Sequence, residues 1–195
     1  GEQAFTLAPH ETRVFRAAGT RALPGGMYLS EMPGRINVAE EGIEFPEPDP
    51  MIHRAIVPWQ NTRSNGERPR YTGWGGARAD SSPYGQMLRI ADREFLTGIG
   101  VLANSRLEVR GNGFRRFSAM VGRDDSGPDD GSRVRFEVHG DGKLLGASEW
   151  MGLAEPAKPL SVDTGGAAIV ELVVRGDGKA ARPVPVTWGD AALLP

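Results

Sequence analysis

Aromatic side chains and hydrogen-bonding groups gather between positions 59 and 78 of this chain. Binding a sugar requires an aromatic ring against the apolar face of the pyranose and a few polar groups that reach its hydroxyls. This stretch supplies both kinds of group, in Trp59, Gln60, Asn61, Arg63, Tyr71, Trp74 and Arg78. We predict carbohydrate contacts from five of them, namely Trp59, Asn61, Arg63, Trp74 and Arg78.

The tryptophans differ in how well they suit a ligand contact. Trp59 lies in an irregular stretch and is the best candidate for an exposed ring, with anchoring of a long loop as an equal alternative. Trp150, in Glu149-Trp150-Met151, is a further candidate for a ligand contact.

Catalytic groups are not predicted in this chain. Glycosidases that retain configuration use two carboxylates about 5 Å apart, and the barrel-strand ends that usually carry them are missing here. Asp124-Asp125 is the best-placed acidic pair, but aspartate favours turns by binding nearby backbone amides, which is the preferred interpretation. The three histidines are His10, His53 and His139, and no Gly-x-Ser-x-Gly elbow accompanies them.

Composition excludes several other classes of function. The formal net charge is -2, and no basic run exceeds Arg115-Arg116, which disfavours nucleic-acid binding. Cysteine is absent, so disulfides, thiol catalysis and thiolate zinc sites are excluded. No segment approaches the about 20 apolar residues of a membrane span. The 27 glycines and 15 prolines indicate many turns and few long helices.

Short strands dominate the chain from residue 86 onward and predict an all-β sandwich. The candidates are Met27–Glu31 and then 86–91, 94–101, 105–110, 114–122, 133–139, 143–149, 159–163, 168–175 and 184–193. Residues 134–138 alternate apolar and polar, as a half-buried antiparallel strand does, and Gly140-Asp141-Gly142 predicts a tight turn after them. The apolar run at 169–174 predicts a central strand.

The first part of the chain contains fewer predicted strands and is interrupted by glycine and proline. Residues 4–17 predict a hairpin, and the glycines and prolines up to position 26 indicate a domain boundary. We therefore divide the chain into 1–20, a terminal hairpin and linker that would close a preceding β-domain, and 21–195, the sandwich. Residues 33–73 form an irregular excursion that is much longer than a usual connection and is expected to carry function or pack over a surface.

The sandwich portion resembles the NPCBM domain, also described as a family 51 carbohydrate-binding module. The resemblance begins at Tyr28-Leu-Ser-Glu31 and continues through Trp74-Gly-Gly-Ala-Arg-Ala-Asp-Ser81, Phe95-Leu-Thr-Gly-Ile-Gly-Val101, Phe117-Ser-Ala-Met-Val-Gly-Arg-Asp-Asp125, Phe136-Glu-Val-His-Gly-Asp-Gly-Lys143 and Trp188-Gly-Asp-Ala191. It implies a galactose-binding-like β-sandwich, or jelly roll. Because Trp74 and Trp188 lie inside these motifs, core packing is the favoured interpretation for both.

The resemblance also implies partners and a cofactor. Modules of this kind often hold a structural Ca²⁺, for which we predict Asp80, beside Ser81, and Asp190, with capping of turns by both aspartates as the alternative. Residues 3–17, through Leu7-Ala-Pro-His10 and Val14-Phe15, resemble the last hairpin of the β-domain in melibiase-type α-galactosidases. We therefore expect a non-catalytic, galactoside-binding module of a secreted or periplasmic bacterial hydrolase. The catalytic domain of that same hydrolase would be a further partner of the module.

Two departures from the family pattern leave alternatives open. Relatives place His after Gly-x-Gly-Val, where this chain has Leu102, and the excursion at 33–73 is longer than in most of them. One alternative is a structural packing domain that binds no sugar. The other is that residues 33–73 contribute to the active site of a parent hydrolase.

Overall fold

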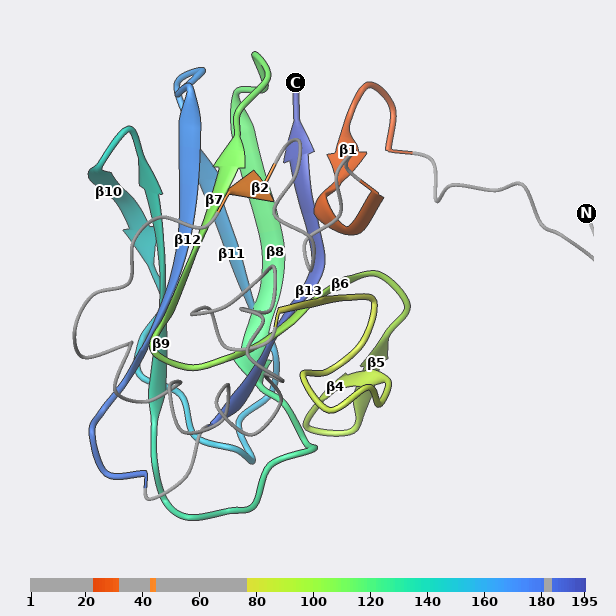
Figure 1. The fold of residues 1–195 in the computed structure, drawn as a ribbon, viewed down its shortest axis with the longest axis vertical. Helices are drawn as coiled ribbons and strands as arrows, with labels where there is room; N and C mark the ends of the chain where they lie inside the picture. The colour runs from red at the N-terminus through yellow and green to blue at the C-terminus, as the bar shows by residue number, and fades with distance from the viewer. Residues whose placement is uncertain (1–22, 32–42, 45–76, 181–183) are drawn as a thin grey trace, which may run out of the picture.

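Two antiparallel sheets face each other in the computed structural model of the chain (Figure 1), which describes residues 23–31, 43–44, 77–180 and 184–195. The strands of the first sheet run in the order β11 (Lys158–Asp163), β8 (Arg116–Arg123), β13 (Pro185–Leu194), β6 (Gly98–Leu102) and β3 (Arg78–Ala79), and β1 (Met27–Tyr28) also pairs with β13. Those of the second run in the order β10 (Lys143–Ala147), β9 (Val134–Gly140), β12 (Ile169–Gly176), β7 (Ser105–Arg110) and β2 (Ile43–Glu44). The predicted all-β sandwich is confirmed.

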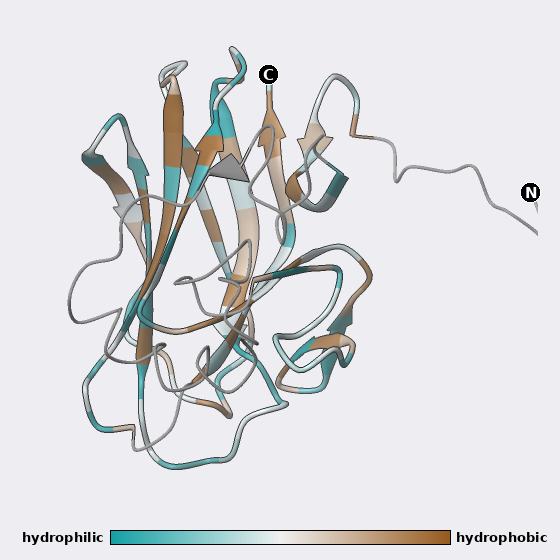
Figure 2. Ribbon diagram, in the orientation of Figure 1, coloured by the Kyte–Doolittle hydropathy of each residue, from teal (hydrophilic) through white to brown (hydrophobic). Residues whose placement is uncertain are grey.

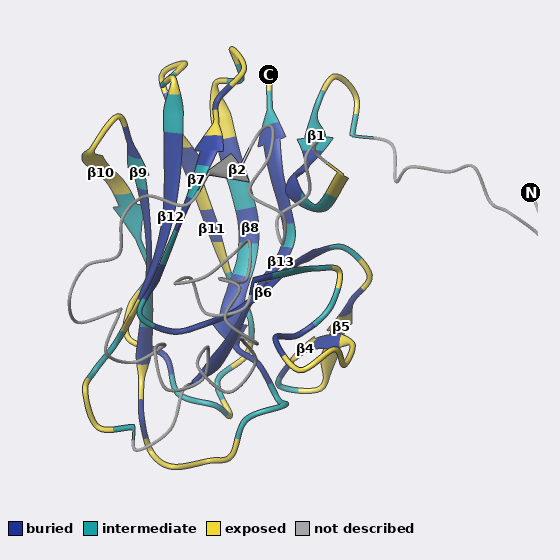
Figure 3. Cartoon of the chain, in the orientation of Figure 1, coloured by how far each residue is buried: buried dark blue, intermediate teal, exposed yellow. Residues whose placement is uncertain are grey.

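Alternating side chains fill the space between the sheets. Val134, Phe136 and Val138 are fully buried, while the residues between them point to the outer face of β9. The ring of Trp188 packs edge-on against Phe136 and Phe117, with centroid distances of 4.9 Å and 5.9 Å. Figures 2 and 3 show the apolar and buried positions following the strands. Core packing, the favoured interpretation of Trp188, is therefore confirmed.

A small hairpin of β4 (Leu88–Ile90) and β5 (Arg93–Phe95) packs on the outer side of the first sheet as a second apolar cluster. Glycines make room for it. A Cβ on Gly189 would lie 2.4 Å from a carbon of the Phe95 ring, and one on Gly122 would lie 2.5 Å from Ile90. The bare backbone at these positions lets the hairpin approach the sheet closely.

The predicted turns and central strand are present. β9 and β10 form a hairpin through Asp141 and Gly142, whose φ angles of 48° and 80° are the left-handed pair of a type I′ turn. β12 lies in the middle of the second sheet, between β9 and β7, as its continuous apolar sequence predicts.

Three expectations about strands need correction. The predicted strand Met27–Glu31 is a two-residue strand followed by a 3-10 helix, Leu29–Glu31. The predicted strand 94–101 is two strands, since the chain turns at Leu96 and Thr97 to leave the small hairpin and enter the sheet. The excursion 33–73 is not wholly irregular, because β2 pairs with β7. Within the described residues, no helix has the length and hydrophobicity of a membrane span.

Candidate functional site

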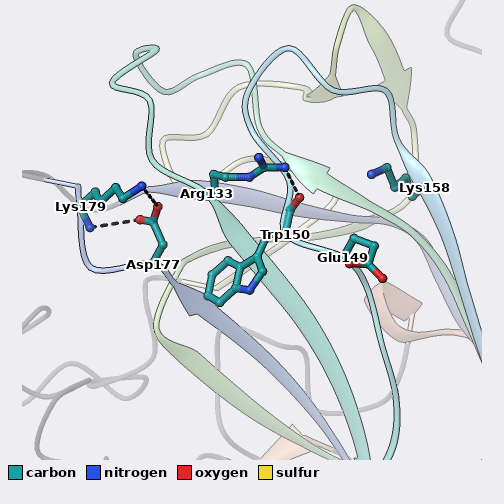
Figure 4. A pocket seen from close by; sticks show the side chains of 6 residues that line it. All are labelled: Arg133, Glu149, Trp150, Lys158, Asp177 and Lys179. Carbon is teal, nitrogen blue, oxygen red and sulfur yellow. Dashed lines mark hydrogen bonds and ion pairs between the residues drawn. The ribbon is translucent and has the colours of Figure 1, made fainter.

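An open pocket of about 470 Å³ lies at one end of the sandwich, where β9 and β11 begin and β10 and β12 end (Figure 4). Its volume falls in the range of about 300–1,000 Å³ that is typical of small-molecule sites. The lining side chains come from four separate segments and are Arg133, Glu149, Trp150, Lys158, Asp177 and Lys179. Loops at one end of a rigid sandwich are where binding residues usually lie.

Strand-like alternation places the ring of Trp150 in this pocket. The next residue, Met151, is fully buried and forms a bridge with Val134 through two backbone hydrogen bonds, of 2.8 Å and 2.9 Å. Because neighbouring side chains in extended backbone point in opposite directions, Trp150 faces outward. The exposed fraction of Trp150 is 36%, so part of the ring is available to a ligand.

Glu155 holds the loop that carries Trp150. Its Oε1 accepts hydrogen bonds from Arg133 at 2.8 Å and from the backbone N–H of Gly152 at 3.1 Å. Its Oε2 accepts from the Lys158 ammonium at 2.9 Å, and Arg133 also donates to the carbonyl of Trp150. The hydrogen bonds from Lys158 and Gly152 lower the pKa of Glu155 below its ordinary value, so it is charged at neutral pH.

A second turn forms the opposite wall. The backbone N–H of Asp177 donates to the carbonyl of Arg133 at 3.0 Å, and Asp177 Oδ1 accepts from the backbone N–H of Lys179 at 3.1 Å. The Lys179 ammonium lies 3.8 Å from Asp177 Oδ2. Figure 4 shows the Trp150 ring between this pair and Glu149. The arrangement offers an aromatic face with donors and acceptors around it, which suits a polyhydroxylated ring.

Other charged clusters in the described part of the chain are structural. On the outer face of β9, Glu137 accepts from Arg175 at 3.1 Å and lies 3.1 Å from the ring of His139. Burial raises the pKa of Glu137, and the hydrogen bonds with these two residues outweigh that effect and bring it below its ordinary value. His139 therefore belongs to a hydrogen-bonded group on the outer face of β9.

Asp124 and Asp125 bind backbone amides, as the turn interpretation predicts. Asp124 Oδ1 accepts from the backbone N–H of Ser126 at 3.0 Å. Asp125 accepts from the N–H groups of Ala91 at 2.9 Å and Asp92 at 3.0 Å, which fastens the turn of the small hairpin. The pair thus joins two segments of the fold.

Similarity to known proteins decides the family. The model of the NPCBM/NEW2 domain matches residues 57–194, which is more than half of the chain. The chain belongs to the NPCBM/NEW2 domain family. None of the curated proteins matches it.

Solved structures similar to this NPCBM/NEW2 domain include CBM51 modules. The structure of the M60 catalytic domain with CBM51-1 and CBM51-2 from Clostridium perfringens ZmpB is 29% identical, with a TM-score of 0.56, over 62% of this chain and 13% of that one. CBM51 from Clostridium perfringens GH95, in complex with methyl-galactose, is 21% identical, with a TM-score of 0.58, over 86% of this chain and 99% of that one. Tandem CBM51 modules of the family 98 glycoside hydrolase Sp3GH98 from Streptococcus pneumoniae are 19% identical, with a TM-score of 0.60, over 94% of this chain and 52% of that one. The last two likenesses show the β-sandwich fold, and the chain spans only a small part of the first protein.

Most of the predicted sugar contacts in this NPCBM/NEW2 domain lie outside the described residues. These are Trp59, Asn61, Arg63 and Trp74. Arg78 is described: it lies half-buried on β3, opposite Gly100, with its guanidinium beside Gly85. It does not line the Trp150 pocket. A role for Arg78 in sugar binding stays a prediction at a different place on the molecule.

The two predicted calcium ligands flank one short segment, Thr97–Gly98. Asp80 Oδ1 accepts from the backbone N–H of Gly98 at 3.0 Å, and Asp190 Oδ1 accepts from the hydroxyl of Thr97 at 2.9 Å. Each aspartate thus has one oxygen committed to the chain. Within the part of the chain that the structure describes, no three acidic, histidine or cysteine side chains gather around one point.

Sequence reasoning named Trp150 but missed its neighbours. Arg133, Lys158, Asp177 and Lys179 are far apart in the sequence and meet only because β9, β11 and β12 have their ends together. The available signal was that Arg133, Lys158 and Asp177 lie within two residues of a predicted strand end. Leu102, which replaces the histidine of relatives, is buried at the end of β6 and does not line the pocket.

Proposed function

We propose that this chain is a non-catalytic carbohydrate-binding module and that it binds sugar in the Trp150 pocket. The exposed ring of Trp150, with charged side chains around it in one pocket, is the observation that carries the proposal. Its apolar face would cover one face of a pyranose, while Arg133, Lys179 and Glu149 would reach the hydroxyls.

Relatives of the same family support a sugar as the ligand. The CBM51 module from Clostridium perfringens GH95 was solved with methyl-galactose, and CBM51-2 of ZmpB, 28% identical over 62% of this chain and 28% of that one with a TM-score of 0.55, was solved with GlcNAc. We propose a galactoside as the ligand here. The ZmpB structure holds its modules beside a catalytic domain.

The module would serve a larger hydrolase. We propose a secreted or periplasmic α-galactosidase-like parent, in which the module keeps substrate close to the catalytic domain. Tethering of this kind raises the effective substrate concentration even when each contact is weak. A structural domain that binds no sugar remains the competing proposal, based on Leu102 in place of histidine.

Replacing Trp150 tests this function. Isothermal titration or NMR titration of the full chain with methyl galactoside should give millimolar binding that Trp150→Ala weakens by about tenfold, since stacking of an aromatic ring contributes about 0.5–1.5 kcal/mol beyond area burial. Leu96→Ala, at an exposed apolar residue directly after β5, is the control and should bind normally. Arg78→Ala distinguishes the predicted site at β3 from the Trp150 pocket. Absence of binding to galactosides and to polymeric glycans by the folded protein would favour the structural proposal.

Calcium binding through Asp80 and Asp190 is also proposed. Oxygen cages for Ca²⁺ combine carboxylates with backbone carbonyls, and both aspartates lie beside the backbone of Thr97–Gly98. A ligand that binds only the folded state raises the melting temperature. Thermal unfolding of the chelator-treated protein with and without added Ca²⁺ checks this, and identical curves would argue against a calcium site.

A further inference from the structure

The cations that line the Trp150 pocket are all paired with carboxylates of the chain. Arg133 and Lys158 share Glu155, at 2.8 Å and 2.9 Å. Lys179 pairs with Asp177 at 3.8 Å. Each lining cation thus has a carboxylate of the chain within 4 Å, although Arg133 and Lys158 share a single one.

Glu149 differs from the other lining residues. It is exposed, and among the described residues none makes a hydrogen bond or ion pair with its carboxylate. Its backbone is fixed, because the hydroxyl of the preceding Ser148 donates to the Glu149 carbonyl at 2.7 Å and accepts from the N–H of Phe136 at 3.0 Å. The backbone that carries this carboxylate is therefore held in place, and the side chain lines the same pocket as the ring of Trp150.

The chemistry of this carboxylate selects among sugars. An ionised carboxylate only accepts hydrogen bonds, through two oxygens, so neighbouring hydroxyls of a neutral sugar can each donate to one of them. Such charge-assisted hydrogen bonds are roughly twice as strong as neutral ones. A sugar that carries its own carboxylate is repelled by the carboxylate of Glu149, and each lining cation already lies beside a carboxylate of the chain.

We infer that Glu149 is a specificity-determining residue, an inference that rests on the proposed function. Its carboxylate would accept hydrogen bonds from adjacent hydroxyls of a neutral sugar stacked on Trp150. The same carboxylate would disfavour the binding of acidic sugars. Methyl galactoside and methyl galacturonoside are matched probes, since they differ only in a hydroxymethyl group and a carboxylate. Like charges about 4 Å apart in water repel by an amount equal to about fivefold in affinity. The wild-type chain should bind the galactoside about fivefold more tightly than the galacturonoside, or more. Added salt should reduce this difference in affinity, because it screens the repulsion.

Glu149→Gln keeps the shape of the side chain and removes its charge. Titrations at neutral pH should show galactoside affinity falling by about tenfold, the loss of a hydrogen bond to a charged group, and preference over the galacturonoside falling to about one. Glu94→Gln, an exposed glutamate of β5 outside the pocket, is the control and should change neither value.

The outcomes separate this inference from the proposed function. If the folded wild-type chain binds neither sugar, or if Trp150→Ala binds as the wild type does, both the proposed function and the role of Glu149 are overturned. If Trp150→Ala loses binding but the wild type takes the two sugars equally, or Glu149→Gln keeps the wild-type preference, the role of Glu149 alone is overturned.

Discussion

Single side chains in the core set how the two sheets meet. Phe136 and Phe117 are fully buried and present their rings to Trp188, one from each sheet. Alternation in the sequence predicts that both are core residues. Aromatic residues of this size make the largest individual contribution to such a core.

Truncating either phenylalanine should destabilise the fold strongly. We expect Phe136→Ala and Phe117→Ala each to lower the free energy of unfolding by about 3–5 kcal/mol, through lost burial and the cavity left behind. Urea denaturation monitored by fluorescence measures this. Leu144→Ala, on the exposed side of β10, should cost less than about 0.5 kcal/mol. If both phenylalanine variants changed the free energy of unfolding only slightly, the neighbouring side chains would have repacked to fill the cavity.

A methyl group is too large for one glycine of β13. In Gly189→Ala the new Cβ meets the ring of Phe95 at 2.4 Å, so overpacking should cost about 1–3 kcal/mol. Because the obstacle is a side chain, Phe95→Leu in the same molecule should recover part of the loss. Additive effects in the double-mutant cycle would contradict direct contact between the two positions.

At the scale of elements, local sequence patterns predict the longer strands, whereas the short strands and the strand boundaries depend on pairing and long-range contacts. Period-two alternation, the apolar run at 169–174 and the Asp-Gly turn are local properties, and β7, β9, β12 and the β9–β10 hairpin follow from them. The two-residue strand β3 and the split between β5 and β6 depend on partners far along the chain, so no local signal announces them. The pocket is non-local in the same way, since four strand ends build it.

The small hairpin depends on one carboxylate from another loop. Asp125 receives two amides of the β4–β5 turn and lies 3.1 Å from Arg89. Asp125→Ala should leave these amides unpaired and let the hairpin open locally before the sandwich unfolds. Hydrogen exchange should rise at 88–95 and stay unchanged in β12. Uniform acceleration across the chain would instead indicate a global loss of stability.

The loop that carries Trp150 is predicted to loosen in acid. The folded-state pKa of Glu155 is lowered, so its contribution is complete above the ordinary glutamate pKa of about 4.3 and is lost as pH falls through the lower folded value. Sugar affinity should be constant from pH 7 to about pH 5 and fall below that range. Glu155→Gln should be weaker at every pH and show less acid dependence. A wild-type decline centred above pH 6 would assign the titration to a different group.

At the scale of the whole molecule, the pocket and the described chain ends lie far apart. β12 ends and β13 begins at the pocket end, whereas β13 finishes beside β1 at the opposite end (Figure 1). A partner that contacted β1 and the end of β13 would therefore lie at the opposite end from the Trp150 pocket. This placement suits a module that presents its ligand site outward from a larger protein.

The pairing of β1 with β13 also bears on mechanical load. Met27 lies opposite Leu193 and Tyr28 opposite Ala192, so the chain enters β1 and leaves β13 side by side, with Gly25 and Gly26 against the last residues. Tension applied through the two ends would pull the strands apart like a zipper, loading their hydrogen bonds one after another. The short β1 should therefore peel away at low force, while the eight-residue strand β8 keeps β13 in the sheet and the pocket in place.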